Sequence, residues 1–304
     1  MKKAEITVVG SYNTDITVHV PHLPKNGETI IGSSMQFNPG GKGSNQAVAA
    51  FRAGADVTFI AKVGCDGMER AGLQLYDKIG MDHKNVIKDA TSSTGMATIE
   101  VDDVTAENRI VVIPGANMTI TADEIKERED LIAKADILLL QFETSRESII
   151  ESVRLAKKHG VKVVLNPAPY SDLVREIIKD VDLITPNETE AELIAPGHGG
   201  DVKATADEII SMGCPNVIIT CGSSGSYYKG EDGEFRIGAK KVTAVDTTGA
   251  GDAYNGALCT AIAEGMEIRD AMKFAGAFAS LSVTRPGAAS SMPDRSETVE
   301  FMKS

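Results

Sequence analysis

A glycine-rich turn that leads into a helix is the part of the sequence best suited to chemistry. Residues 244–265 read A-V-D-T-T-G-A-G-D-A-Y-N-G-A-L-C-T-A-I-A-E-G. This pattern predicts a short apolar strand end, a turn at Gly249, Ala250 and Gly251, and a helix of small residues that stops at Gly265. Glycines let backbone N–H groups crowd around a ligand, and the helix adds the positive end of its dipole. The turn is therefore a candidate anion site.

Asp252 directly follows this turn, and its carboxylate has two interpretations. A lone acid at a helix start is commonly a cap or a partner of the helix dipole. Beside an anion site, the same carboxylate could take the proton of a hydroxyl while backbone amides hold a migrating phosphoryl group. Because a carboxylate at a helix start should ionise easily, we expect Asp252 to be a weak base.

A second glycine-rich run at residues 38–46 reads N-P-G-G-K-G-S-N-Q, and the pattern starts a helix near Ala47. It is not a phosphate-binding P-loop, because that motif requires G-x-x-x-x-G-K-[ST] and Lys42 is followed by glycine. A tight strand-to-helix turn is one interpretation, and backbone placed close to a polyhydroxylated ligand is the other. Three glycines together with Lys42 and Asn45 favour the ligand.

Shorter polar motifs follow three of the predicted strands. Asn13 and Asp15 face the same side of an extended chain, where they could bind sugar hydroxyls or form an Asx turn. Asn187 and Glu190 begin a helix, either as a capping box or as a Mg²⁺–phosphate station in which Glu190 orders the hydrated metal. The T-C-G-S-S-G segment at 220–225 is a glycine turn suited to nucleotide contacts.

Alternation of apolar runs with helical patterns predicts an α/β fold. The strand-like runs are bounded by turn residues or charges, and they cover 6–10, 57–63, 137–140, 161–165, 183–185 and 217–220. Such alternation indicates a central, mostly parallel sheet flanked by helices on both faces, with ligands at the carboxyl ends of the strands.

Segments 12–37 and 94–113 break this alternation. They carry β-branched residues in polar alternation and predict about four strands in a small, half-exposed sheet. We expect this sheet to be a lid over the active site, inserted in a single domain of residues 1–304. Its open face could be buried by a second subunit.

Composition excludes several functional classes. The formal net charge of -12 over 304 residues argues against binding to nucleic acid or to anionic membranes. Four scattered cysteines indicate reduced thiols, the first apolar run is too short for a signal peptide, and no segment has membrane-spanning length. We therefore expect a cytoplasmic protein. The first strand is followed by G-S-Y-N-T-D rather than G-x-G-x-x-G, which argues against a dinucleotide-binding dehydrogenase.

Taken together, the motifs resemble those of the ribokinase-like (PfkB-type) carbohydrate kinase family. G-G-K-G-S-N-Q-A, P-N-E-T-E and D-T-T-G-A-G-D carry the resemblance, with N-T-D near the start and T-R-P-G-A near the end. Lys42 with Asn13 and Asp15 is more similar to members acting on ribose than to those acting on fructose or adenosine. The resemblance implies ATP-dependent phosphorylation of D-ribose at its 5-hydroxyl. Alternatives are a kinase for deoxyribose, another sugar or a nucleoside, and a catalytically silent regulator on the same fold.

The resemblance also implies roles for matching positions. Asp252 would be the base, and Gly249, Ala250 and Gly251 would form the anion hole. The sugar would be held by Asp252 together with Asn13, Thr14, Asp15, Gly41, Lys42, Gly43, Ser44, Asn45 and Glu143. ATP would meet Asn187, Thr220, Cys221, Gly222, Ser223, Ser224, Gly225, Gly251, Asp252 and Gly276. Gly276 stands where relatives commonly carry Asn or His near the adenine.

Metal ions and a second subunit are implied in the same way. Glu190 would serve Mg²⁺. A monovalent cation, K⁺ by resemblance, would bind beside the anion hole, partly through backbone carbonyls, at Asp246, Thr248, Ser282, Arg285, Gly287 and Ser291. A homodimer through the lid sheet is the expected assembly.

Overall fold

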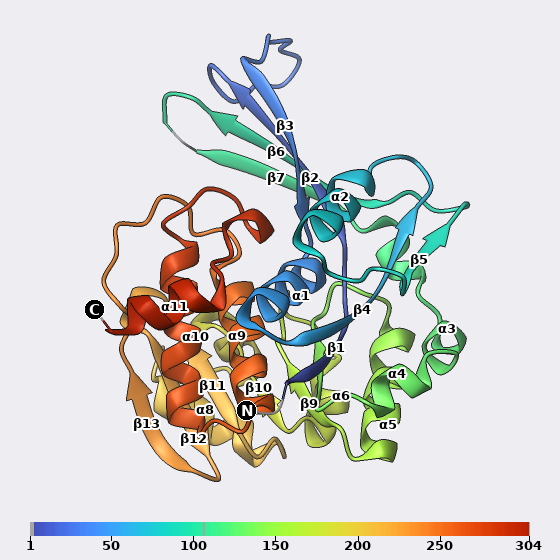
Figure 1. The fold of residues 1–304 in the computed structure, drawn as a ribbon. Coiled ribbons are helices and arrows are strands. Elements are labelled where there is room, and N and C mark those ends of the chain that lie inside the picture. The colour runs from blue at the N-terminus through green and yellow to red at the C-terminus, as the bar shows by residue number, and fades with distance from the viewer. Residues whose placement is uncertain (1–2, 106, 304) are drawn as a thin grey trace.

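The structure is a computed structural model that describes residues 3–105 and 107–303. The predictions that include Met1, Lys2, Ala106 or Ser304 lie, at those positions, outside the described residues. A nine-stranded sheet runs through the body (Figure 1). In sheet order its strands are β13 (Gly233–Ile237), β12 (Ser226–Gly230), β11 (Val217–Thr220), β10 (Leu183–Ile184), β9 (Lys162–Leu165), β8 (Ile137–Leu140), β1 (Glu5–Val9), β4 (Asp56–Gly64) and β5 (Val86–Asp89). All neighbours are parallel except the β11–β12 and β12–β13 pairs. The six predicted strands and the mostly parallel sheet are confirmed.

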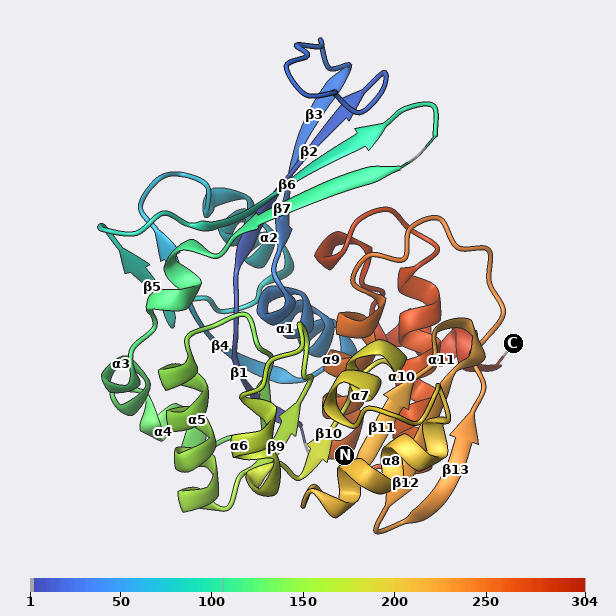
Figure 2. The same cartoon turned by 180° about the vertical axis from the view of Figure 1, so that it is seen from behind.

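Helices cover both faces of this sheet (Figures 1 and 2). One apolar core lies under α1 (Lys42–Ala53), α2 (Arg70–Ile79), α9 (Ala250–Ala263) and α10 (Ile268–Ser282), with α11 (Arg295–Lys303) packed on α10. The other core lies under α3 (Ala122–Lys126), α4 (Glu129–Ala133), α5 (Arg146–His159), α6 (Val174–Ile177), α7 (Glu188–Ile194) and α8 (Val202–Ser211). Short 3₁₀ turns are η1 (Gly115–Thr119), η2 (Ile178–Asp180), η3 (Gly222–Ser224) and η4 (Ala289–Ser291). No helix in the described ranges is long and apolar enough to span a membrane.

The strand order reverses direction between β8 and β1. From β1 the chain moves outward to β4 and β5, and it then returns to β8 on the other side of β1. Ligands of open α/β sheets bind where the order reverses in this way, at the carboxyl ends of the strands. The fold therefore directs attention to the residues that follow β1 and β8.

Four further strands form a small second sheet that projects from the body (Figure 2). In order they are β3 (Ser34–Gly40), β2 (Asn13–Val20), β6 (Gly95–Asp102) and β7 (Asn108–Ile113). The register places Asp15 opposite Ala97, which lies opposite Val112, so these side chains share one face. Ile16 lies opposite Phe37 and belongs to the other face. The predicted small sheet is confirmed.

Two predicted boundaries are wrong. Helix α1 begins at Lys42 rather than near Ala47, because the Glu143 carboxylate accepts the Lys42 amide and Gly43 packs directly on the chain after β1. The apolar residues before the late turn are not a strand end. The amides of Val245 and Asp246 instead donate to the carbonyl of Val283, which ties this loop to the end of α10.

Close packing of α1 on α9 gives a stability prediction. A Cβ at Gly256 would lie 2.5 Å from the Ala49 methyl and 2.6 Å from the Gln46 carbonyl oxygen. Gly256→Ala is therefore expected to lower the free energy of unfolding by about 1–3 kcal/mol, because the helices must separate. Urea denaturation measures this loss. Gly276→Ala, in a helix where a Cβ would meet nothing within 4 Å, is the matched control and should instead gain about 0.5–1 kcal/mol. An unchanged midpoint for Gly256→Ala would contradict the packing.

Candidate active site

The ends of β1 and β8 meet at the point where the strand order reverses. Ser11, two residues past β1, donates its hydroxyl to the carboxylate of Glu143, three residues past β8, at 2.6 Å. The same oxygen, Oε2, accepts the backbone N–H of Lys42 at 2.9 Å. Gly43 lies against this junction, since a Cβ there would stand 2.4 Å from the Ser11 nitrogen. Glu143 thus fixes the start of α1 against the central strands.

Because α1 begins early, its first turn points polar side chains at the start of α9. Asn45 Nδ2 donates to Asp252 Oδ2, and Gln46 Nε2 donates to Asp252 Oδ1, both at 2.9 Å. Gln46 is also held by its neighbours, because it donates to Asn166 and accepts from Gln141 at 2.6 Å. The Asp252 carboxylate is therefore oriented from a helix about 200 residues away in sequence.

Asp252 is not a helix cap. The N-cap of α9 is Gly249, which adopts a left-handed conformation with φ 75°, and the carboxylate is bonded across to α1. Burial raises the pKa of Asp252, against the opposing effects of the Lys42 charge and the two amide donors. The expectation that this acid ionises easily is wrong, because burial disfavours the charged form of the carboxylate. A raised pKa makes Asp252 a better proton acceptor once it is ionised.

Lys42 is the cation among several acids. Burial lowers its pKa, but Asp252, Glu143 and Glu190 together raise it, so that the net shift is upward and Lys42 stays charged. Asp15 reaches this cluster from β2 of the small sheet. Burial, followed by the charges of Glu143 and Asp252, raises the pKa of Asp15 to about 7.

The small sheet delivers two polar side chains to the same region. Asn13 and Asp15 lie two residues apart on one face of β2, as predicted from their spacing. Gly40 leaves room for this arrangement, because a Cβ there would meet the Asp15 carboxylate at 2.3 Å. Gly41, with φ 86°, lies against the backbone of Ser11 and Asn13. The site is thus built from the body and from the small sheet.

Two side-chain oxygens in this region, those of Asn45 and Gln141, are buried without a hydrogen-bond partner among the described residues. Asn45 Oδ1 has no hydrogen bond within residues 3–105 and 107–303, while its Nδ2 is committed to Asp252. Buried polar atoms are normally paired, so an unpaired one beside a candidate base indicates a ligand donor such as a hydroxyl.

The turn before Asp252 is open on its outer side. Gly251 is exposed, and a Cβ there would meet no atom within 4 Å. The Ala250 amide closes the turn on the Thr247 carbonyl at 3.2 Å. The first amides of a helix have no intrahelical acceptor, so Gly251 and Asp252 offer backbone donors next to the carboxylate. This geometry suits an anion that approaches Asp252.

Two of the predicted nucleotide segments lie side by side at the carboxyl ends of β10 and β11. Asn187 forms an isolated parallel bridge with Thr220, which ends β11. The following turn, Cys221 to Gly225, closes on itself through the bond from the Cys221 amide to the Gly225 carbonyl, and its residues 222–224 are exposed. Gly276 lies within α10 with open space around its Cα.

Asn187 and Glu190 form the capping box that was one of their two interpretations. Glu190 Oε2 accepts the Asn187 amide at 2.9 Å, and Asn187 Oδ1 accepts the Glu190 amide at 2.8 Å. Burial raises the pKa of Glu190, and Lys42 and Asp252 are close enough to affect it. The cap therefore does not remove this carboxylate from the site. Among the described residues, no group of three His, Cys, Asp or Glu side chains could hold a metal by itself.

The residues of the predicted monovalent-cation site join two loops. Asp246 accepts the amides of Thr248 at 2.9 Å and Gly287 at 2.8 Å. The hydroxyls of Ser282 and Ser291 are buried and donate to nearby carbonyls. Arg285 turns outward and pairs with Glu297. Because its side chain is itself a cation, Arg285 could offer a bound cation only its backbone carbonyl.

Two predicted sugar contacts point into the protein. The Thr14 hydroxyl donates to the Met68 carbonyl, and the Ser44 hydroxyl bonds to Tyr76 at 2.6 Å. The structure does not bring these hydroxyls to the site. Gln46, which it does bring to Asp252, was not predicted, although it stands in the G-K-G-S-N-Q run beside Asn45.

A buried carboxylate beside helix-start amides and a lysine, at the carboxyl ends of parallel strands, is an arrangement suited to phosphoryl transfer onto an alcohol. Comparison with known proteins agrees. Residues 3–295 match the model of the pfkB family carbohydrate kinases. The chain belongs to this family.

Individual relatives match over almost the whole chain. The ribokinase of Haemophilus influenzae is 41% identical over 302 residues, covering 98% of both chains. The deoxyribokinase of Salmonella typhi is 33% identical, again covering 98% of both. The structure of Arabidopsis thaliana ribokinase complexed with ribose and ATP superposes with a TM-score of 0.92 at 30% identity, covering 100% of both.

Proposed function

We propose that this protein transfers the γ-phosphoryl group of ATP to the 5-hydroxyl of D-ribose, giving ribose 5-phosphate and ADP. The ribokinases among its relatives, and the one complexed with ribose and ATP, support this substrate pair. The observation that carries the proposal is the position of Asp252. It is buried at the start of α9, is held by Asn45 and Gln46, and lies near the positive charge of Lys42.

The proposed mechanism uses each of these features. Asp252 accepts the proton of the sugar 5-hydroxyl. The oxygen of that hydroxyl forms a bond to the γ-phosphorus while the bond from the γ-phosphorus to the bridging oxygen of the β-phosphate breaks, and ADP leaves. The free amides of Gly251 and Asp252, at the end of the turn formed by Gly249, Ala250 and Gly251, meet the charge of the transferring group together with the dipole of α9 and Lys42. Asn13, Asp15, Gly41, Gly43, Asn45 and Glu143 hold the sugar. Asn187, the turn from Thr220 to Gly225, and Gly276 line the ATP side.

Two metal ions belong to the proposal. Mg²⁺ would neutralise phosphate charge, and it typically keeps several waters and takes only one or two protein carboxylates. Glu190 fits the role of such a carboxylate. The capping box occupies one of its two oxygens, Oε2, and the carboxylate lies within electrostatic reach of Lys42 and Asp252. K⁺ would be held by the carbonyl-rich junction of the Asp246 loop with residues 282–291, where its charge would support the turn at Gly249. We also propose that residues 1–304 form one kinase domain.

The pKa of Asp15 gives a pH prediction. An acid with a raised pKa loses its charged form as the pH falls through that value, here about 7. Ionised Asp15 is the stronger acceptor for a sugar hydroxyl, so kcat/KM for ribose should fall below about pH 7, and the raised pKa of Asp252 acts in the same direction. Asp15→Asn should lower kcat/KM and remove the part of the acid limb near pH 7. A wild-type profile that is flat from pH 8 to pH 5 would contradict the assignment.

We further propose a homodimer through the small sheet. The face of the small sheet opposite to Asp15 carries four apolar side chains that are each about half exposed or more. They are Met35, Phe37, Val111 and Ile113. Strand β7 is exposed along its length and is an edge strand, which makes it a candidate for contact with a second copy.

Val111→Glu tests this interface. A two-fold axis would bring a charge from each copy into an apolar contact, so the dimer Kd should rise by at least about 100-fold. Sedimentation velocity across a concentration series measures the change. Val299→Glu, an equally sized change at an exposed position of α11, should leave the assembly intact. A Val111→Glu protein that sediments like the wild type would place the interface elsewhere.

An ADP-release assay with a substrate panel tests the proposed function. Ribose, deoxyribose, fructose and adenosine are compared at equal ATP and Mg²⁺, with K⁺ or Na⁺ as the monovalent ion. Ribose should have the highest kcat/KM, and K⁺ should raise the rate. A preference for deoxyribose would make the protein a deoxyribose kinase of the same family, like the 33% identical relative. No turnover with any of the four would favour a silent regulator. We place the reaction in the cytoplasm, which the four free cysteines support.

A further inference from the structure

The side chain of Asn117 joins segments that enter and leave the small sheet. It is 1% exposed within η1, directly after β7. Its Oδ1 accepts the amide of Tyr12, the residue before β2, at 2.9 Å. Its Nδ2 has three acceptors, each at 2.9 Å, which are the Tyr12 carbonyl, the Pro114 carbonyl and Asn13 Oδ1.

These contacts fix the direction of two amides. The Tyr12 N–H can only donate, so the atom of Asn117 that faces it must be the oxygen. Asn117 Nδ2 therefore faces the carbonyl of Tyr12 and the side chain of Asn13. Because a donor is met by an acceptor, Asn13 presents Oδ1 to Asn117 and keeps Nδ2 for other partners. Asn13 is thereby set as a hydrogen-bond donor beside Asp15, which is an acceptor when ionised.

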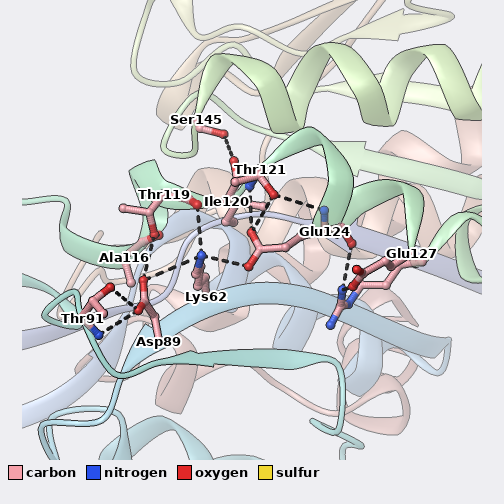
Figure 3. Close-up of polar contacts among 11 residues, drawn as sticks. Lys62, Asp89, Thr91, Ala116, Thr119, Ile120, Thr121, Glu124, Glu127 and Ser145 are labelled. Carbon is pink, nitrogen blue, oxygen red and sulfur yellow. Dashed lines mark hydrogen bonds and ion pairs between the residues drawn. The ribbon is translucent and has the colours of Figure 1, made fainter.

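Neighbouring residues keep η1 in place. Lys62, only 8% exposed, donates to the Thr119 carbonyl at 3.0 Å and pairs with Glu124 at 2.9 Å. Figure 3 shows Lys62 between Asp89, Thr119 and Glu124, and it shows the Ser145 hydroxyl directed at the Ile120 backbone. The turn that carries Asn117 is thus anchored to β4 and to the helices of the body.

Gly95 leaves the space in which the two amides meet. It is the first residue of β6 and pairs with Asn13 in the small sheet. A Cβ at this position would lie 2.3 Å from both Asn117 Nδ2 and Asn13 Oδ1. A side chain there would therefore separate the pair.

We propose that Asn117 is a positioning residue for sugar recognition, which fixes Asn13 with its Nδ2 toward a substrate hydroxyl. This inference rests on the proposed function, because it assigns a partner to the Asn13 amide. Asn117 itself does not contact the substrate. Its loss should weaken sugar binding while leaving the nucleotide side of the site unchanged.

A thermodynamic cycle tests the inference. Asn117→Asp keeps the acceptor for Tyr12 but removes the donor to Asn13, so the KM for ribose should rise about tenfold while the KM for ATP stays within about twofold. In an Asn13→Ala background the same change should have an effect on ribose KM below about twofold, because the amide to be oriented is gone. Equal effects of Asn117→Asp in both backgrounds would overturn the proposal.

Two further variants keep the test decisive. Gly95→Ala breaks the same contact from the opposite strand and should reproduce the rise in ribose KM. If Asn117→Asp does not fold, Gly95→Ala tests the positioning of Asn13 in its place. An unchanged ribose KM for Gly95→Ala would then overturn the proposal. Asn216→Asp is the matched control, since Asn216 also bridges backbone groups but lies at the start of β11. Failure of this inference can be told apart from failure of the proposed function, because in the second case the wild-type protein itself would not phosphorylate ribose.

Discussion

The Asp252→Asn variant is expected to lose about 10²- to 10⁴-fold in kcat, the usual contribution of a positioned general base. The amide has the size of the carboxylate but cannot take the hydroxyl proton. The KM for ATP should change little, because the amides of the turn at Gly249 remain. Steady-state kinetics at saturating ribose and ATP measures this loss.

The matched control for this variant is Asp270→Asn. Asp270 is also an acid in the first turn of a helix, α10, but it is exposed and pairs with Lys273. Its replacement should leave kcat unchanged, which separates the loss of a base from the loss of a helix-dipole partner. A kcat for Asp252→Asn within tenfold of the wild-type value would refute the assignment of Asp252 as the base.

Lys42→Met should have the second largest effect, a loss of about 10²- to 10³-fold in kcat. The lysine is the positive charge near Asp252, Glu143 and Glu190, and it would meet the charge of the transferring phosphoryl group. Methionine keeps much of the length and the apolar stem of the side chain. The variant also tests electrostatic coupling, because the Lys42 charge lowers the pKa of Asp252.

The coupling has a defined sign. Without Lys42 the pKa of Asp252 rises further, and since the base works only when ionised, the acid limb of kcat should move to higher pH. The pH profile of Lys42→Met is therefore compared with that of Lys203→Met, in which an exposed lysine is replaced. A reduced kcat with an unmoved acid limb would show that Lys42 contacts the phosphate without influencing Asp252.

Much of this fold could be predicted from local patterns. The central strands are short apolar runs between turn residues, and each was located to within one or two residues. The small sheet was found because residues 12–37 and 94–113 lack helical periodicity. The capping box at Asn187 and Glu190, one of the two interpretations of that pair, follows from residue type and spacing alone. These features depend on neighbours in sequence, which a single chain reveals.

What could not be predicted depends on contacts between distant segments. Glycine and serine disfavour helix, so the local pattern predicts a late start for α1, whereas the structure anchors that turn through Glu143, about 100 residues away. Asn117 belongs to no recognised motif, and Gln46 is the last polar residue of a glycine-rich run in which nothing marks it for a role. The importance of both arises from partners in other elements. The ionisation of Asp252 was misjudged for the same reason, since its burial comes from the packing of α1 on α9.

A crystal structure with ribose and a non-hydrolysable ATP analogue is the most direct test of Asp252 as the base for the 5-hydroxyl. We expect a carboxylate oxygen of Asp252 about 2.6–3.2 Å from the 5-hydroxyl, with the γ-phosphate at the amides of Gly251 and Asp252. This assignment would be contradicted by a bound sugar whose 5-hydroxyl lies beyond hydrogen-bonding reach of Asp252, with that carboxylate bonded only to Asn45 and Gln46.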